Sequence, residues 1–177
     1  MCDTTLDEAI TKFEQISLQN KMRLVRQLTT GLDILFERSL IHRDIKPQNI
    51  MLKGSSFDDY QVKIGDFGLS RRLPLPVYET TQSVGTPLYM APEIPERKPF
   101  KIDVDVWALG CLVYSLFVGR PPFDAKNFGM LASMHTEGNY SYPVGCDIPV
   151  EAISFVDRCL RFEPEAREKV YLLHQDH

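Results

Sequence analysis

Acidic, basic and amide side chains gather in two short segments of this chain. The first segment is His42-Arg43-Asp44-Ile45-Lys46-Pro47-Gln48-Asn49, and the second is Asp66-Phe67-Gly68. Carboxylate and amide oxygens are hard ligands that suit Mg²⁺, and a lysine can neutralise charge on a phosphate. Taken alone, each aspartate would be an ordinary helix cap or turn residue. Brought together by the fold, the two segments could bind a metal-bound phosphate.

The pattern of apolar residues predicts the elements on either side of these segments. Residues 20–38 are expected to form a long amphipathic helix that leads into the first segment. Strands are expected at Ile50–Lys53 and Gln61–Ile64, joined by a polar turn as a hairpin with a long loop. The first segment therefore precedes one strand of the hairpin, and the second segment directly follows the other.

The rest of the chain is predicted to be mainly helical. Further helices are expected at Leu6–Phe13 with Thr4 or Thr5 as its cap, 105–118, 126–137, 150–162 and 167–174. Six prolines between residues 69 and 102 argue against a regular helix or central strand there. A loop of this length in a compact domain usually has a function.

Composition narrows the class of protein. The chain has 177 residues, of which 44% are hydrophobic and 25% charged, so we expect a single domain spanning 1–177. The net charge of −4 gives no basic footprint for nucleic acid. The apolar run Val106–Val118 is too short to cross a membrane, and the start of the chain has no signal-peptide pattern. Four cysteines without a CxxC pair are expected to be reduced thiols, which favours a cytoplasmic or nuclear protein.

The two segments resemble the HRDxKPxN catalytic loop and the DFG motif of eukaryotic serine/threonine protein kinases. Ala91-Pro92-Glu93 resembles the APE motif, Asp105 to Gly110 the DxWxxG helix start, and Arg167 the late arginine of the family. The similarity extends over essentially the whole chain, in the same order and spacing. It implies the mainly α-helical large lobe of a protein kinase, with a small β-hairpin next to the catalytic cleft. It also implies ATP and Mg²⁺ as cofactors and protein substrates with serine or threonine acceptors.

The resemblance assigns roles to residues of the catalytic segments. Asp44 would accept the proton of the substrate hydroxyl, and Lys46 would place a cation on the transferred phosphate. Asn49 and Asp66 would be the Mg²⁺ ligands. Met51 would form part of the floor beneath adenine, although a plain core methionine is an equally good interpretation.

Other residues are expected to support the site. Phe67 would pack behind Asp66 and set its direction, while Gly68 would permit the backbone to turn. His42 is expected to be a packed, hydrogen-bonded residue and not a general base.

Residues farther along the chain are also expected to hold the catalytic loop. Asp105 would accept backbone N–H bonds from that loop, and Glu93 and Arg167 would form a buried ion pair. Thr86 would hydrogen-bond toward the catalytic aspartate and lysine.

Substrate choice and regulation also follow from the resemblance. Lys46 is typical of serine/threonine kinases, and Leu69 after DFG resembles kinases that favour serine. Gln48 replaces a glutamate of arginine-directed kinases, so strong basic selectivity is not expected. Arg43 precedes the catalytic aspartate, as in kinases that an upstream kinase activates by phosphorylating the activation loop. The candidate acceptors in that loop are Thr80, Thr81 and Ser83.

The small N-terminal lobe of the family is not represented in this sequence. No GxGxxG loop is present, and no VAIK-type lysine precedes the catalytic loop. Three interpretations stay open. The sequence is part of a longer kinase, or it is a truncated, catalytically weak module that binds substrates or partners, or a partner chain completes it.

Overall fold

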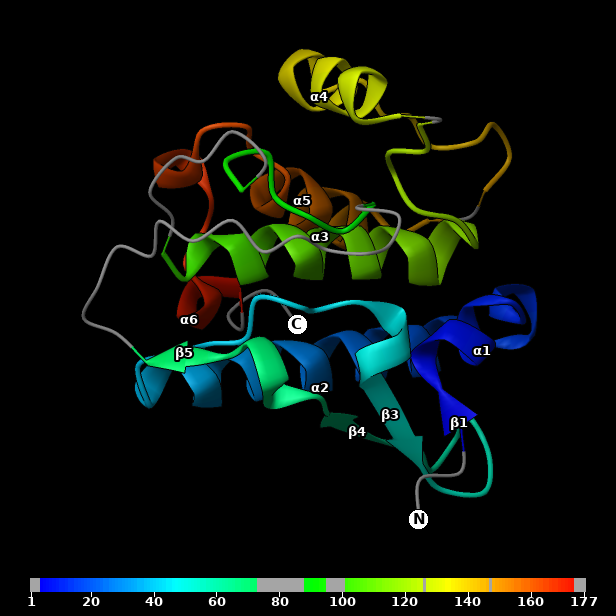
Figure 1. Ribbon diagram of the computed structural model, residues 1–177. Helices are drawn as coiled ribbons and strands as arrows, with labels where there is room; N and C mark the ends of the chain where they lie inside the picture. Colours follow the sequence, from blue (N-terminus) through cyan, green and yellow to red (C-terminus); the bar gives the residue numbers. More distant parts are fainter. Residues whose placement is uncertain (1–3, 73–87, 95–100, 126, 147, 174–177) are drawn as a thin grey trace.

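Two long helices, α2 (Leu18–Glu37) and α3 (Asp103–Val118), run side by side through the centre of the molecule (Figure 1). The computed structural model describes residues 4–72, 88–94, 101–125, 127–146 and 148–173. Helix α5 (Val150–Cys159) lies against α3 on the side away from α2. The other helices are α1 (Leu6–Ile10), α4 (Phe128–Glu137) and α6 (Val170–Leu173). Short 3₁₀ turns occur at η1 (Phe13–Gln15), η2 (Pro47–Asn49), η3 (Phe67–Leu69) and η4 (Pro164–Ala166).

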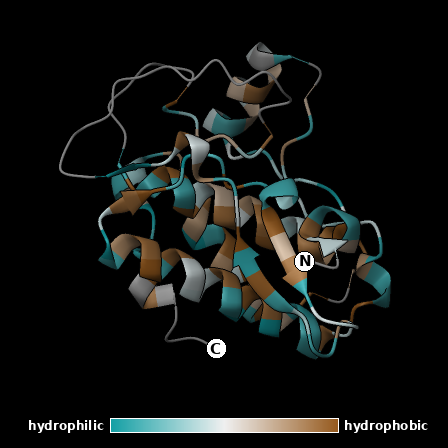
Figure 2. Cartoon of the chain, turned by 60° about the horizontal axis from the view of Figure 1, so that its bottom comes forward, coloured by the Kyte–Doolittle hydropathy of each residue, from teal (hydrophilic) through white to brown (hydrophobic). Residues whose placement is uncertain are grey.

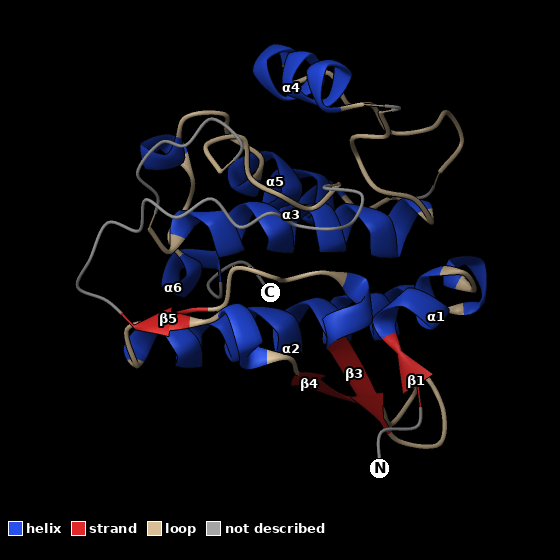
Figure 3. Ribbon diagram, in the orientation of Figure 1, coloured by secondary structure: helices blue, strands red, loops and turns tan. Residues whose placement is uncertain are grey.

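The strands are few and short, as Figure 3 shows in red. Strands β1 (Thr4–Thr5), β3 (Ile50–Lys53) and β4 (Gln61–Ile64) form an antiparallel sheet in the order β1-β3-β4. Strands β2 (Leu40–Ile41) and β5 (Arg71–Arg72) form a second antiparallel pair. Along the chain, β2 and β3 therefore flank the His42–Asn49 segment, and β4 and β5 flank the Asp66–Gly68 segment.

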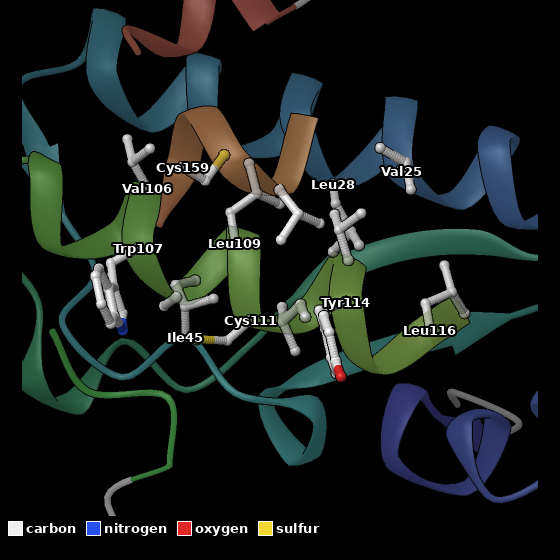
Figure 4. Packing of buried hydrophobic residues seen from close by; sticks show 14 of the residues in the cluster. Val25, Leu28, Ile45, Val106, Trp107, Leu109, Cys111, Tyr114, Leu116 and Cys159 are labelled. Atoms are coloured by element: carbon white, nitrogen blue, oxygen red, sulfur yellow. The ribbon is translucent and has the colours of Figure 1, made fainter. Parts of the chain in front are cut away.

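The core is built around α3, in which every residue from Val104 to Val118 is buried. Figure 4 shows Val25 and Leu28 of α2 and Cys159 of α5 among the buried residues packed around it. A helix that is covered on all sides needs no polar face. The other helices bear both apolar and hydrophilic residues along the same ribbon (Figure 2), as expected where only one side is buried.

Local chemistry explains where the long helices begin and end. The Ser17 hydroxyl accepts a hydrogen bond from the Asn20 N–H at 3.3 Å and caps the N-terminus of α2. Helix α3 ends at Gly119, which has a φ of 79°. The Phe13 ring also fills the space that a Cβ at Gly119 would need. Both the positive φ and the ring therefore require a glycine at this position.

The predicted fold class is confirmed, because the described chain is mainly helical with a small hairpin. Both hairpin strands have the predicted bounds, and the predicted helices are present with ends shifted by a few residues. The predicted helix Leu6–Phe13 is wrong in its second half, since α1 ends at Ile10 and a separate 3₁₀ turn follows. Strand β5 lies in the proline-rich region, where it forms a short pair and not a central strand.

Two further findings concern the described residues. No helix among them has both the length and the apolar character that a membrane span requires. Cys111 and Cys159 are buried free thiols and Cys146 is an exposed one, while Cys2 lies outside the described residues.

Candidate active site

The loop after β2 places an aspartate, a lysine and an asparagine in direct contact. The Lys46 ammonium donates to both carboxylate oxygens of Asp44, at 2.9 and 2.8 Å. The Asn49 amide nitrogen donates to the Asp44 carbonyl at 2.8 Å and to its Oδ2 at 2.9 Å. Pro47 starts the 3₁₀ turn η2, which curls the chain so that Asn49 returns to Asp44. The side chains of Asp44 and Lys46 are partly exposed, so a substrate can reach them.

A buried carboxylate of α3 holds the start of this loop. Asp105 Oδ2 accepts the His42 N–H at 2.7 Å, and Asp105 Oδ1 accepts the Arg43 N–H at 2.9 Å. These are the backbone bonds that the sequence led us to expect of Asp105. Burial raises the pKa of Asp105 to about 6, and the two backbone donors oppose that rise. Arg43 has a φ of 69°, an uncommon conformation for a residue with a side chain.

The His42 ring joins the loop to Gly65, the residue that follows β4. Its Nε2 donates to the Gly65 carbonyl at 2.8 Å, and its Nδ1 accepts the Asp44 N–H at 3.3 Å. Burial lowers the pKa of His42, which keeps the ring neutral and is consistent with this pattern of one donor and one acceptor. The ring is fully buried, and its geometry suits the packing role that we expected.

Asp66 is exposed and lies next to this junction. The Gly65 N–H donates to the Asn49 carbonyl at 2.8 Å, so a backbone bond ties the residue before Asp66 to the other expected Mg²⁺ ligand. Asp44 and Asp66 both lie near enough to the His42 ring to oppose the lowering of its pKa by burial. The two segments that were far apart in the sequence therefore meet at one place.

The backbone turn at Asp66-Phe67-Gly68 differs from our expectation. Asp66 itself has the left-handed conformation, with a φ of 57°, whereas Gly68 has no positive φ. Aspartate tolerates this conformation because its side chain bonds locally, and here Oδ1 accepts the Gly68 N–H at 3.3 Å. A Cβ at Gly68 would lie 3.2 Å from that oxygen, so the small residue leaves room for the carboxylate.

Phe67 contacts the His42 ring edge-on, with the ring centroids 5.0 Å apart. We expected Phe67 to pack behind Asp66, but 46% of its surface is exposed. Met51 is partly exposed in β3, and its Cε lies 2.9 Å from the place that a Cβ at Gly65 would take. Both apolar side chains therefore border the site without being enclosed by described residues.

The donor atoms fit a small, hard cation together with phosphate. The described residues contain no group of three or more His, Cys, Asp or Glu side chains that could hold a metal on its own. Asn49 points its amide nitrogen at Asp44, which leaves its carbonyl oxygen as the ligand atom. Mg²⁺ needs only one or two protein ligands when phosphate oxygens and water supply the rest. Asn49 and Asp66 would hold it, and Lys46 would face the phosphate.

A second buried cluster links the Ala91-Pro92-Glu93 segment to the C-terminal region. Arg167 Nη1 lies 2.6 Å from Glu93 Oε1, and Nη2 lies 2.8 Å from Oε2, so the expected ion pair is present and buried. The guanidinium also donates to the carbonyls of Asp103 (3.1 Å), Phe162 (3.1 Å) and Arg161 (2.8 Å). Its carbon lies 5.0 Å from the centre of the Trp107 ring.

Some expected residues fall outside the described part of the chain, and one contact was not foreseen. Thr80, Thr81, Ser83 and Thr86 lie outside the described residues. The unforeseen contact joins Gln48 to α1, because its amide nitrogen donates to Asp7 Oδ1 at 2.8 Å. No pattern in the sequence pairs these two residues, since they are far apart and both are ordinary polar types.

Comparison with known proteins gives consistent results. A family model described as protein kinase domain matches residues 1–176. The chain is 34% identical over 145 residues to serine/threonine-protein kinase PLK4 of Nematostella vectensis, covering 82% of the chain and 14% of that protein. It is 37% identical over 144 residues to serine/threonine-protein kinase TIO of Arabidopsis thaliana, covering 81% and 10%. It is 34% identical over 145 residues to serine/threonine-protein kinase fused of Drosophila melanogaster, covering 82% and 17%. The chain thus spans less than a fifth of the length of these relatives.

Proposed function

Because the chain belongs to the protein kinase family, we propose that it transfers the γ-phosphoryl group of ATP to serine or threonine hydroxyls of protein substrates. The observation that supports this most directly is the contact of Asp44 with both Lys46 and Asn49, beside the Gly65–Asp66 junction. Phosphoryl transfer requires positioning and charge neutralisation more than covalent chemistry from the protein. Asp44, Asn49 and Asp66 can position the substrate and the metal, and Lys46 can neutralise charge on the phosphate.

Each residue would act through its own atoms. The Asp44 carboxylate would orient the substrate hydroxyl and accept its proton, and the Lys46 ammonium would offset negative charge on the phosphate. Asn49 and Asp66 would hold Mg²⁺, which when bound neutralises charge on the phosphate oxygens. Asp105 would keep the loop rigid through its two backbone bonds. In this proposal the neutral His42 is a spacer between the two segments.

Substrate choice and regulation extend the proposal. We expect serine to be preferred over threonine, and basic peptides to gain little from Gln48, whose amide is already bonded to Asp7. Arg43 Nε donates to the Leu69 carbonyl at 2.6 Å, which places the guanidinium beside the segment that follows DFG. Phosphorylation of a loop hydroxyl by an upstream kinase would add charge that an arginine can pair. Mass spectrometry of active protein tests this, and full activity with no phosphate on the loop would reject it.

The experiment that tests the function compares the chain with an Asp44→Asn variant. Transfer of labelled phosphate from Mg-ATP to a serine peptide should fall at least about a hundredfold in Asp44→Asn. An Asp124→Asn variant is the matched control, because Asp124 is exposed and outside the site. Transfer that persists in Asp44→Asn would reject the proposed base.

A second measurement separates a transferring enzyme from a binding module. Mg²⁺-dependent binding of ATP should weaken in Asp66→Asn and remain in Asp44→Asn, because only the first change removes a proposed ligand. Nucleotide binding without any transfer by the wild-type chain would favour the alternative, a kinase-like module that binds substrates or partners. Binding that is unaffected by Asp66→Asn would reject the proposed metal site.

A further inference from the structure

One face of α2 holds the β3–β4 hairpin at several successive points. The residues of this face are Asn20, Arg23, Gln27 and Gly31. Their spacing of three or four residues puts them on one side of a helix. At the hairpin turn, the Asn20 amide donates to Asp58 Oδ1 at 2.7 Å, and Arg23 Nη2 donates to the Phe57 carbonyl. The helix therefore contacts the turn first and the strand farther along.

Gln27 bonds the strand with both ends of its amide. Its Nε2 donates to the Tyr60 carbonyl at 3.1 Å, and its Oε1 accepts the Val62 N–H at 2.8 Å. Residues 60 and 62 present these groups on the edge of β4 away from β3, where a further strand would otherwise pair. One side chain thus supplies the donor and the acceptor of a neighbouring strand.

Gly31 brings α2 close to the end of the same strand. A Cβ at Gly31 would lie 2.9 Å from Ile64 Cδ1, which is too close for any larger residue without movement. The helix contacts the hairpin at the turn, the middle of β4 and its last residue. A slip of β4 by one residue would break the Gln27 bonds and turn Val62 and Ile64 outward.

The two catalytic segments therefore have separate anchors. Asp105 of α3 holds the loop that carries Asp44, and Gln27 of α2 holds the strand that leads to Asp66. The segments meet at Gly65, whose N–H and carbonyl bond Asn49 and His42 respectively.

We propose that Gln27 is a positioning residue, which fixes β4 on α2 so that Asp66 keeps its place relative to Asp44. The importance of the Asp44–Asp66 spacing rests on the proposed function. The attachment of β4 to α2 by Gln27 does not depend on it. Gln27 touches neither segment and acts only through the strand. The chain of contacts runs from the Gln27 amide through Val62 and Ile64 to Gly65.

Amide hydrogen exchange tests the anchor without any nucleotide. Gln27→Met keeps the length of the side chain and removes both bonds, and Gln19→Met is the matched control at an exposed position of the same helix. Protection of the Val62 and Gly65 amides should fall about tenfold in Gln27→Met and stay within about twofold in Gln19→Met. If protection falls at Val62 but not at Gly65, Gln27 bonds only the edge of β4 and the proposal is overturned. Unchanged protection at both amides would also overturn it.

Metal binding tests the consequence for Asp66. Electron paramagnetic resonance with Mn²⁺ and ATP should show about threefold to tenfold weaker Mn²⁺ affinity in Gln27→Met, while ATP affinity without metal stays unchanged. A general loss of structure would weaken both. If Gln27→Met does not fold, Gln27→Leu replaces it, since that variant also removes both bonds. Wild-type protein that binds no Mn²⁺ with ATP would count against the proposed function, and the exchange data would still decide the anchor.

Discussion

The buried pair of Glu93 and Arg167 should dominate the response of the fold to mutation. The guanidinium has five N–H groups, and all five have acceptors: two carboxylate oxygens and three backbone carbonyls. Only 4% of Arg167 and 3% of Glu93 is exposed. A charge in such a place has no access to water when its partner is removed.

The expected loss of stability in Glu93→Gln follows from these contacts. The substitution removes the counter-charge and turns one acceptor into an amide donor that faces the Arg167 guanidinium. A hydrogen bond to a charged group contributes about 1.5–3 kcal/mol, and breaking one side of a buried ion pair costs about 3–5 kcal/mol. We expect the free energy of unfolding to fall by about 3–5 kcal/mol. The control is Arg161→Met, because Arg161 is exposed and contacts Arg167 through its backbone carbonyl, which the substitution keeps. This variant should change the free energy of unfolding by less than about 0.5 kcal/mol.

A double-mutant cycle separates the pair from its surroundings. Arg167→Met leaves the Glu93 carboxylate buried and three carbonyls without their donor, so its cost should exceed that of Glu93→Gln. The double variant carries no unpaired charge, so its cost should be smaller than the sum by about 2 kcal/mol or more. Urea unfolding followed by circular dichroism measures all four proteins. Costs that add to within about 0.5 kcal/mol would refute the coupling.

Two pH effects of opposite sign and one backbone effect should also be measurable. Burial lowers the pKa of His135 to about 4, so wild-type stability should fall by about 3 kcal/mol more than that of His135→Phe as the pH drops from 7 to 4 in urea unfolding. Burial raises the pKa of Asp105 to about 6. As the pH rises from 4 to 7, the free energy of unfolding of wild type should therefore fall by about 2 kcal/mol more than that of Asp105→Asn. Gly119→Ala should lower the thermal midpoint far more than Gly138→Ala. Both positions have positive φ, but only the first faces a ring, that of Phe13. Equal shifts would show that the ring contact is unimportant.

Sequence alone predicted the elements whose signal is local. The hairpin strands were located to the residue because a polar turn separates two short strand-like segments. Helix α2 follows from the spacing of its apolar residues, and α3 from the predominantly apolar stretch Val106–Val118. The two-residue strands β2 and β5 were missed, since pairing between Leu40–Ile41 and Arg71–Arg72 depends on the fold and has no pattern of its own.

The same distinction applies to the candidate site. The residues of the catalytic segments stand out in the sequence because their types and order are unusual. Gln27 does not, because an amide on a helix surface looks like any solvated residue until the strand edge that it bonds is known. The turn at Asp66 was assigned to Gly68 because glycine is the usual residue with positive φ, but a local bond to the carboxylate made the aspartate adopt it instead.

Backbone strain marks the same site independently of any motif. Within the described part of the chain, the non-glycine residues with positive φ are Ser39, Arg43 and Asp66. Each such residue costs on the order of 1 kcal/mol or more and persists only where its surroundings enforce it. Arg43 is held by the buried Asp105 carboxylate, and Asp66 follows the strand that α2 holds. Strain and a buried charge thus coincide at the junction of two anchored segments, which is where a fixed geometry is needed for phosphoryl transfer.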